Sequence, residues 1–530
     1  MIIALTGQLS CSLCYNAVMD LKEERWLTWF LVVFFLLVIS VPFLIAQFTI
    51  NNEFTFGGFL FNPIDGTSYL AKMRQGFDGE WLFRLPYTAE PGEGAPINLI
   101  YLFLGHVAKA TGWSLLFTFH AVRMLGALLL ALALLRLFRR CFDKPGERIL
   151  AFGLTLFGSG LGWLAIMFGG FTSDFWVAEA IPFLSAYANP HFALGLAMQV
   201  WLLTPRRVET GFRWPLLALT GGVAALLSVV YPFGWAAASA VYWSWLGWLA
   251  YKKQLRRADL VHGLVIVLAG LPYSIYGFLL IRAHPLLAQW DAQNLIPSPP
   301  LLDLMVAFSP TLVFAVWGAF TKFKGQRAVR YLTVWLLAGI IILYLPINLQ
   351  RRLITGLYIP VAGLAAVGVS QIRWRTSQKR YLALALFILS LPTNAIVVAG
   401  GFQAASNNHP LLVINSRELT AFEWLDANVP QSSLVLASPA TGLLLAPYAG
   451  VRVIYGHPLE TALATQREQE LQAFFSTTWA QGEAQDYLQR WGVDYIYYGP
   501  SERALGQLPE IPGWQAVYET KDVLILASAP

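Results

Sequence analysis

Residues 26–46 read WLTWFLVVFFLLVISVPFLIA, an apolar run without a single charged residue. The charged tetrapeptide KEER, residues 22–25, precedes it directly. A run of about 20 apolar residues crosses a bilayer as one helix, so we predict a membrane span here. Further apolar runs that predict spans begin near Trp113, Ile149, His191, Trp214, Trp235, Val261, Leu301, Tyr331, Leu353 and Tyr381. The sequence therefore predicts a polytopic α-helical membrane protein with about eleven transmembrane helices.

The composition of the 530 residues agrees with a membrane protein. Hydrophobic residues make up 57% of the chain and charged residues only 12%, about half of what a soluble domain carries. The mean hydropathy is +0.55 and the pI is about 9.1. The basic residues form short clusters between apolar runs rather than one patch, a pattern that indicates loop orientation and not nucleic-acid binding.

The short basic loops predict the orientation of the chain. They are 22–25, 136–148, 206–213, 252–257, 322–330 and 373–380, and together they hold 22 of the 36 Lys and Arg residues. Such loops stay in the cytoplasm, so we expect the N-terminus inside and the C-terminus outside the plasma membrane. We expect no cleavable signal peptide, and Met19 is an alternative start. The Cys11–Cys14 pair has no second pair nearby, and we assign it no redox or metal role.

Three regions follow from this topology. Residues 1–25 form a cytoplasmic tail, and residues 26–400 form the transmembrane domain, with a large first outside loop at 47–111. Residues 401–530 form a small extracytoplasmic α/β domain, because their apolar runs shorten to strand length and alternate with amphipathic helices. The predicted strands are Ser433–Ala437, Val451–Tyr455, Asp494–Tyr498 and Val523–Ala527, and the predicted helices are Glu418–Asn428, Thr461–Thr478 and Ala484–Trp491.

The first outside loop contains the sequence NPIDGTSYLAKMRQG, residues 62–76. Asp65 and Gly66 signal a turn, and an amphipathic helix follows. Asp65 at the start of this helix is placed to act as a general base beside a lipid phosphate. The alternative is that it is only an N-cap residue, and one residue can serve both roles. Tyr69, Lys72 and Arg74 on the same helix are candidate substrate-binding side chains.

Two other outside segments contain polar candidates. Arg351 and Arg352 break the charge pattern of the outside loops. They either bind a lipid phosphate, or they extend toward lipid headgroups or pair with an acid of a loop. His191, at the entry of a span, either contacts the ligand or caps its helix. In GHPLET, residues 456–461, His457 and Glu460 are candidate contacts to the acceptor or part of an ordinary helix start.

The remaining motifs exclude several classes of chemistry. His and acidic residues do not cluster with metal-ligand spacing, so no dedicated metal site and no cofactor is predicted, although a divalent metal stays open. No phosphate-binding loop, dinucleotide fingerprint or hydrolase motif is present.

These motifs together resemble the GT-C superfamily of integral-membrane glycosyltransferases, and in particular bacterial proteins of the protein O-mannosyltransferase and lipid A arabinosyltransferase group. The resemblance rests on residues 65–76, on NPHF at 189–192, on Arg351–Arg352 and on residues 456–461. It implies that Asp65 is the catalytic base and that the sugar donor is a polyprenyl-phosphate lipid. Many relatives carry two adjacent acids where this chain has Asp65 and Gly66.

The resulting hypothesis is an inverting glycosyltransferase that acts on the outer face of the membrane. Its partners are the lipid-linked donor, membrane lipids and an acceptor that is a protein, a lipid or a polysaccharide. The alternatives are a transporter or lipid flippase, and a non-catalytic membrane protein whose tail binds glycan. Polar residues inside the spans would favour transport, and Arg123 is the main residue of this kind.

Overall fold

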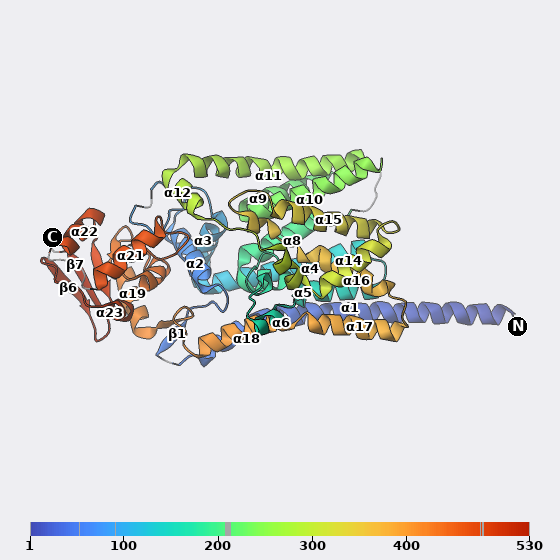
Figure 1. The fold of residues 1–530 in the computed structure, drawn as a ribbon, viewed down its shortest axis with the longest axis horizontal. Helices are drawn as coiled ribbons and strands as arrows, with labels where there is room; N and C mark the ends of the chain where they lie inside the picture. The colour runs from blue at the N-terminus through green and yellow to red at the C-terminus, as the bar shows by residue number, and fades with distance from the viewer. Residues whose placement is uncertain are drawn as a thin grey trace. The chain divides into compact units, whose positions relative to one another are not determined.

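The computed structural model describes residues 2–51, 53–90, 92–206, 214–476, 479 and 482–528. It is 68% helical and divides into two compact units (Figure 1). The helical unit comprises Met1–Pro42, Val122–Pro272 and Ile296–Ala399, and the sheet unit comprises Phe43–Ala121, Tyr273–Leu295 and Gly400–Pro530. The side chains of Cys11, Cys14 and Met19 lie outside the described part of the structure.

Five helical segments among the described residues are long and apolar enough to cross a membrane. They are Lys22–Thr49, Leu115–Cys141, Arg257–Ala283, Gln350–Gln371 and Thr376–Ser406. The number is up to seven if each of two bent helix pairs is one span. These pairs are Pro145–Phe157 with Gly162–Phe168, bent by 47°, and Leu301–Phe308 with Thr311–Lys322, bent by 92°. The predicted class, a helical membrane protein, is therefore confirmed, while the count of eleven spans stays a prediction.

The helical unit is an assembly of helices without a sheet among its described residues. In whole or in part it contains α1 (Ile2–Thr49), α4 (Leu115–Cys141), α5 (Pro145–Phe157), α6 (Gly162–Ala165), η1 (Ile166–Phe168), η2 (Ser173–Phe175), α7 (Pro182–Ala188), α8 (Pro190–Leu203), α9 (Trp214–Val230), α10 (Pro232–Tyr251), α11 (Arg257–Ala283), α13 (Leu301–Phe308), α14 (Thr311–Lys322), α15 (Arg327–Leu343), η3 (Gln350–Ile354), α16 (Tyr358–Gln371), α17 (Thr376–Leu389) and α18 (Pro392–Ser406).

Helix α16 forms the centre of this unit. Its residues from Tyr358 to Val369 are all buried, and small residues let neighbouring backbones approach closely. A Cβ atom on Gly368 would lie 2.0 Å from the carbonyl oxygen of Phe314 in α14. The Gly and Ala content of α16 thus accounts for its close packing against α14.

Arg123, the polar residue noted within a predicted span, has a structural role. Its side chain is 1% exposed, and its Nη1 donates to the carbonyl oxygens of Ile39 at 3.1 Å and Ala186 at 3.0 Å. Backbone carbonyls therefore satisfy the hydrogen-bonding needs of this buried guanidinium. These hydrogen bonds connect α4 to α1 and α7.

The sheet unit combines segments from three distant parts of the sequence. It contains β1 (Phe54–Phe56), α2 (Pro63–Asp78), α3 (Leu99–Thr111), α12 (Pro285–Gln293), β2 (Val413–Asn415), α19 (Ser416–Asn428), β3 (Leu434–Leu436), α20 (Pro439–Ala449), β4 (Arg452–Val453), α21 (Ala464–Phe475), α22 (Glu483–Trp491), β5 (Tyr495–Tyr498), α23 (Pro500–Leu505), β6 (Trp514–Glu519) and β7 (Leu524–Ser528). Strands β1 and β2 pair antiparallel, so the first outside loop joins the C-terminal segment.

Five strands form the main sheet in the order β4-β3-β5-β7-β6, and they appear at the red end of the colour bar in Figure 1. Strand β3 is parallel to β4 and β5, whereas β7 is antiparallel to β5 and β6. The side chains of β3 alternate between two cores, because Val435 packs with α19 and α20 while Leu434 and Leu436 pack with α21 and α22. Helices thus cover both faces, as parallel strands require.

The elements of the C-terminal segment agree with the sequence patterns in most places. The four predicted strands coincide with β3, β4, β5 and β7, and the three predicted helices with α19, α21 and α22. The patterns do not predict α20 or β6. The boundaries 1–25, 26–400 and 401–530 stay predictions, since the compact sheet unit also includes the first outside loop.

Candidate active site

The N-cap of helix α2 lies three residues before Asp65, the N-cap that the turn signal predicts. Its N-cap is Asn62, with φ 47° and ψ 56°, and Pro63 follows with the fixed φ that suits the first helical position. Asp65 therefore lies within the first turn, and the hypothesis that Asp65 is the N-cap is wrong. A carboxylate in the first turn is still stabilised by the positive end of the helix dipole.

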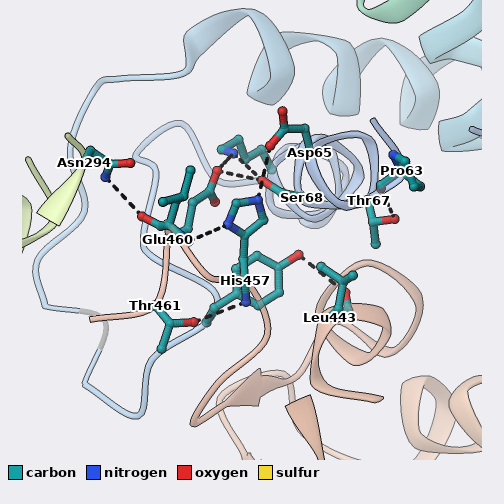
Figure 2. A network of polar contacts seen from close by, with 12 residues as sticks. Pro63, Asp65, Thr67, Ser68, Asn294, Leu443, His457, Glu460 and Thr461 are labelled. Atoms are coloured by element: carbon teal, nitrogen blue, oxygen red, sulfur yellow. Dashed lines mark hydrogen bonds and ion pairs between the residues drawn. The ribbon is translucent and has the colours of Figure 1, made fainter. Parts of the chain in front are cut away.

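The Asp65 carboxylate accepts a hydrogen bond from His457. The distance from His457 Nε2 to Asp65 Oδ1 is 3.3 Å, and Figure 2 shows the two side chains pointing toward one another. The Asp65 side chain is 42% exposed, whereas that of His457 is 3% exposed. One partner is thus held inside the protein while the other stays accessible to a substrate.

The hydrogen bonds of the imidazole indicate its tautomer. The backbone N–H of Leu459 donates to His457 Nδ1 at 3.1 Å, so Nδ1 carries no proton. The proton of the neutral ring is then on Nε2, which faces Asp65. His457 therefore acts as a hydrogen-bond donor that orients the Asp65 carboxylate.

A turn at residues 456–461 holds His457 in place. The hydroxyl of Thr461 accepts from the backbone N–H groups of Gly456 and His457, at 3.3 and 3.2 Å. Gln293, the last residue of α12, donates through Nε2 to the carbonyl oxygen of Thr461 at 2.7 Å, and Asn294 donates to that of Leu459 at 3.1 Å. These contacts fix the turn from two sides.

An ion pair lies one to two helical turns further along α2. Lys72 Nζ lies 2.6 Å from Glu460 Oε1 and 2.6 Å from Ser68 Oγ, and the Ser68 hydroxyl donates to Glu460 at 2.7 Å. Figure 2 shows this network beside His457. The Lys72 and Glu460 side chains are 3% and 14% exposed, so both charges are largely buried.

The pKa of Glu460 reflects two opposing effects. Burial disfavours the charged form and would raise this pKa, but Lys72 and His457 and the hydrogen bonds from Lys72 and Ser68 outweigh burial. The net result is a pKa below the usual value. Glu460 is therefore a stable carboxylate at neutral pH, and it forms the ion pair with Lys72.

The two other candidates on α2 also have intramolecular partners. Tyr69 stacks on Tyr101 of α3 with ring centroids 4.3 Å apart. Arg74 pairs with Asp78 at 2.9 Å and also with Asp426 of α19. Burial would lower the pKa of Arg74, but these two carboxylates raise it. Arg74 thus connects α2 to α19.

His191, Arg351 and Arg352 belong to the helical unit. The guanidinium of Arg351 lies 4.8 Å from the ring of Trp176, and Arg352 Nη1 lies 2.5 Å from Glu179 Oε1. Glu179 is 4% exposed, so Arg352 neutralises a buried acid. Paired arginines beside an aromatic ring are a typical environment for phosphate binding.

His191 packs among aromatic rings. Its ring centroid lies 4.1 Å from that of Phe192 and 6.0 Å from that of Tyr231. It is the second residue of α8, after the N-cap Asn189, so it does not cap this helix.

Sequence patterns miss several residues of the site. Ser68, Gln293 and Glu179 are single polar residues in otherwise ordinary surroundings, and no local signal distinguishes them. Around Asp65 and His457, the described residues include no group of three or more His, Cys, Asp or Glu side chains arranged to hold a metal ion.

No protein-family model matches the sequence, and no curated protein matches it. Solved structures do match the fold. One is the archaeal oligosaccharyltransferase AglB from Archaeoglobus fulgidus, in complex with an inhibitory peptide and a dolichol-phosphate. The match has 12% sequence identity and a TM-score of 0.57, and it covers 90% of this chain and 70% of that chain.

A second match is ArnT from Cupriavidus metallidurans bound to undecaprenyl phosphate. This match has 11% sequence identity and a TM-score of 0.50, and it covers 94% of this chain and 97% of that chain. Both AglB and ArnT are GT-C superfamily glycosyltransferases. The resemblance that the sequence motifs indicate is therefore confirmed at the level of the fold.

Proposed function

We propose that this chain is an integral membrane glycosyltransferase that moves a sugar from a polyprenyl-phosphate-linked donor to an acceptor hydroxyl. The fold it shares with AglB and ArnT supports this proposal, because those structures hold dolichol-phosphate and undecaprenyl phosphate. The distribution of basic loops supports a plasma-membrane protein with its N-terminus inside and residues 401–530 outside. Transfer then occurs on the outer face.

The proposal that Asp65 is the catalytic base rests on one observation. Asp65 is the accessible member of a hydrogen-bonded pair whose other member, His457, is buried and points its N–H at the carboxylate. Such a carboxylate is held in one orientation yet can reach a substrate, which is what a general base needs.

In the proposed reaction, Asp65 removes the proton of the acceptor hydroxyl as the oxygen attacks the anomeric carbon. The bond from that carbon to the phosphate oxygen breaks on the opposite side, and the lipid phosphate leaves with the electron pair. A single displacement of this kind inverts the anomeric configuration. His457 keeps Asp65 aligned, and Glu460 with Lys72 keeps the 456–461 turn against α2.

Arg351 and Arg352 are the proposed ligands of the lipid phosphate. Guanidinium groups bind phosphate oxygens in bidentate fashion and offset negative charge that grows on a leaving phosphate. Because Arg352 also neutralises Glu179, we expect Arg352→Lys to preserve that ion pair but to weaken donor binding.

The test is sugar transfer from polyprenyl-phosphate donors in proteoliposomes. We expect Asp65→Asn to lower kcat by about 10²–10⁴-fold, the usual contribution of a general base. The matched control is Glu80→Gln in the same loop, whose side chain is 49% exposed and pairs with Arg84 at 3.5 Å. Full activity in Asp65→Asn, or equal loss in Glu80→Gln, would contradict the assignment.

A further inference from the structure

A cavity of about 440 Å³ lies in the helical unit, at the ends of helices that are joined by the short basic loops. Five basic and three acidic side chains line it, together with the aromatic rings of Tyr242 and Trp245. None of the proposed catalytic residues lies in this lining. The cavity is therefore a separate feature of the protein.

Two of the three acids are neutralised by their neighbours. Glu147 pairs with Lys144 at 3.3 Å and accepts from the Ser370 hydroxyl at 2.7 Å. Asp259 receives two hydrogen bonds from Arg256, at 2.8 and 2.7 Å. The third acid, Asp143, is exposed.

Arg206 brings a largely buried positive charge to the wall. Its Nη2 donates to the Thr220 hydroxyl at 3.0 Å, while Nη1 is buried and has no hydrogen-bond partner among the described residues. Burial lowers the pKa of Arg206, and Arg136 lowers it further, although Tyr242 and Asp259 act in the opposite direction. A buried guanidinium with an unused N–H group is costly unless an acceptor is present, so this wall favours an anion.

Arg327 adds a second charge from the first turn of α15. It is exposed, and its guanidinium lies 5.8 Å from the ring of Trp245. Gln326, the N-cap of α15, makes no side-chain cap hydrogen bond, and residues 326–328 at the start of this 17-residue helix line the cavity. The backbone N–H groups and the dipole at a helix N-terminus attract anions.

We propose that this cavity binds the phosphate group of an anionic lipid headgroup in the leaflet next to the short basic loops. The ligand chemistry is a phosphate with net negative charge, and the helix ends place it at the depth where headgroups lie. Trp245 and Tyr242 are residues that favour the membrane interface. A cavity of this volume is larger than a phosphate ion needs and accommodates a headgroup.

The test is ligand-induced thermal stabilisation of the purified full-length protein in neutral detergent, at constant ionic strength. Three probes separate the sources: short-chain phosphatidylglycerol, short-chain phosphatidylcholine and inorganic phosphate. We expect phosphatidylglycerol alone to raise the apparent Tm in a saturable manner. We expect Arg206→Gln and Arg327→Gln each to weaken its apparent Kd by roughly tenfold, the effect of one charge-assisted hydrogen bond.

Arg139→Gln is the matched control, because Arg139 is exposed near the end of α4 and does not line the cavity. If Arg206→Gln does not fold, the exposed Arg327 decides the test. Equal stabilisation by phosphatidylcholine would overturn the proposal in favour of non-specific acyl-chain binding, and equal stabilisation by inorganic phosphate in favour of a free-anion site. Unchanged affinity in Arg327→Gln, or a loss as large in Arg139→Gln, would also overturn it. Sugar transfer is not the readout, so this test is independent of the proposed function.

Discussion

The substitution Glu460→Gln removes the carboxylate that neutralises Lys72, a lysine whose side chain is only 3% exposed. At a separation of 2.6 Å and an effective dielectric constant of about 20, the attraction between the two charges is about 6 kcal/mol. Desolvation of both ions offsets part of it. Removing one partner of a buried pair costs about 3–5 kcal/mol, because the other charge stays behind in the protein.

This cost is measurable as a change in thermal stability. We expect the apparent Tm of Glu460→Gln to fall by roughly 3–5 °C at pH 7.5, because the entropy of unfolding scales with the 530 residues of the chain. The double variant Lys72→Met with Glu460→Gln leaves no buried charge and should recover most of this loss. The reasoning is refuted if Glu460→Gln is as stable as the parent protein, or if the double variant is less stable than the single one.

The pH dependence supplies a second readout of the same ion pair. Since the folded-state pKa of Glu460 lies below its usual value of 4.5, its contribution to stability is fully present above about pH 4.5. That contribution is lost as the pH falls through the folded-state pKa. Glu460→Gln should lack this part of the acid destabilisation, and an unchanged acid profile would argue against the assignment.

Three further substitutions test other parts of the structure. His457→Phe removes the donor that orients Asp65, and we expect kcat to fall by about 10²-fold with little change in KM, measured by transfer kinetics. Burial, followed by the charges of Glu502 and Asp522, raises the pKa of Glu418 to about 7, although a hydrogen bond from Tyr497 lowers it. The free energy of unfolding therefore falls as the pH rises from about 4.5 through 7, where the unfolded chain ionises first. Glu418→Gln should therefore raise the Tm at pH 8 and not at pH 4. Gly76→Ala places a Cβ atom 2.0 Å from a carbonyl oxygen of α3 and should cost about 1–3 kcal/mol in unfolding experiments, whereas Gly146→Ala meets open space and should be neutral.

Local hydrophobic patterns predict many of the spans, strands and helices of this protein, because these patterns reflect which residues are buried from solvent. The run at 26–46 is apolar throughout, and in the structure it lies inside the candidate span Lys22–Thr49. The alternation of short apolar runs with amphipathic segments after residue 401 corresponds to β3, β4, β5 and β7 and their helices. Burial of apolar surface sets these periods, so a single sequence contains them.

Local patterns fail where the backbone adopts an unusual conformation. The turn signal at Asp65 predicts the start of α2 too late, because Asn62 takes a left-handed conformation and Pro63 then begins the helix. Helix α12 likewise begins at a proline, Pro285, after its N-cap His284. In both places proline stands at the first helical position and not in a loop interior.

The sequence by itself determined that this is a membrane protein of many helices, which polar loops it carries and that Asp65 is a candidate base. Only the tertiary structure decided which polar residues are partners. His457 lies 392 residues from Asp65, and Glu460 lies 388 residues from Lys72. The physical reason is that apolar burial depends on local periodicity, whereas a hydrogen bond or an ion pair depends on a distance of about 3 Å between groups that only the folded chain brings together.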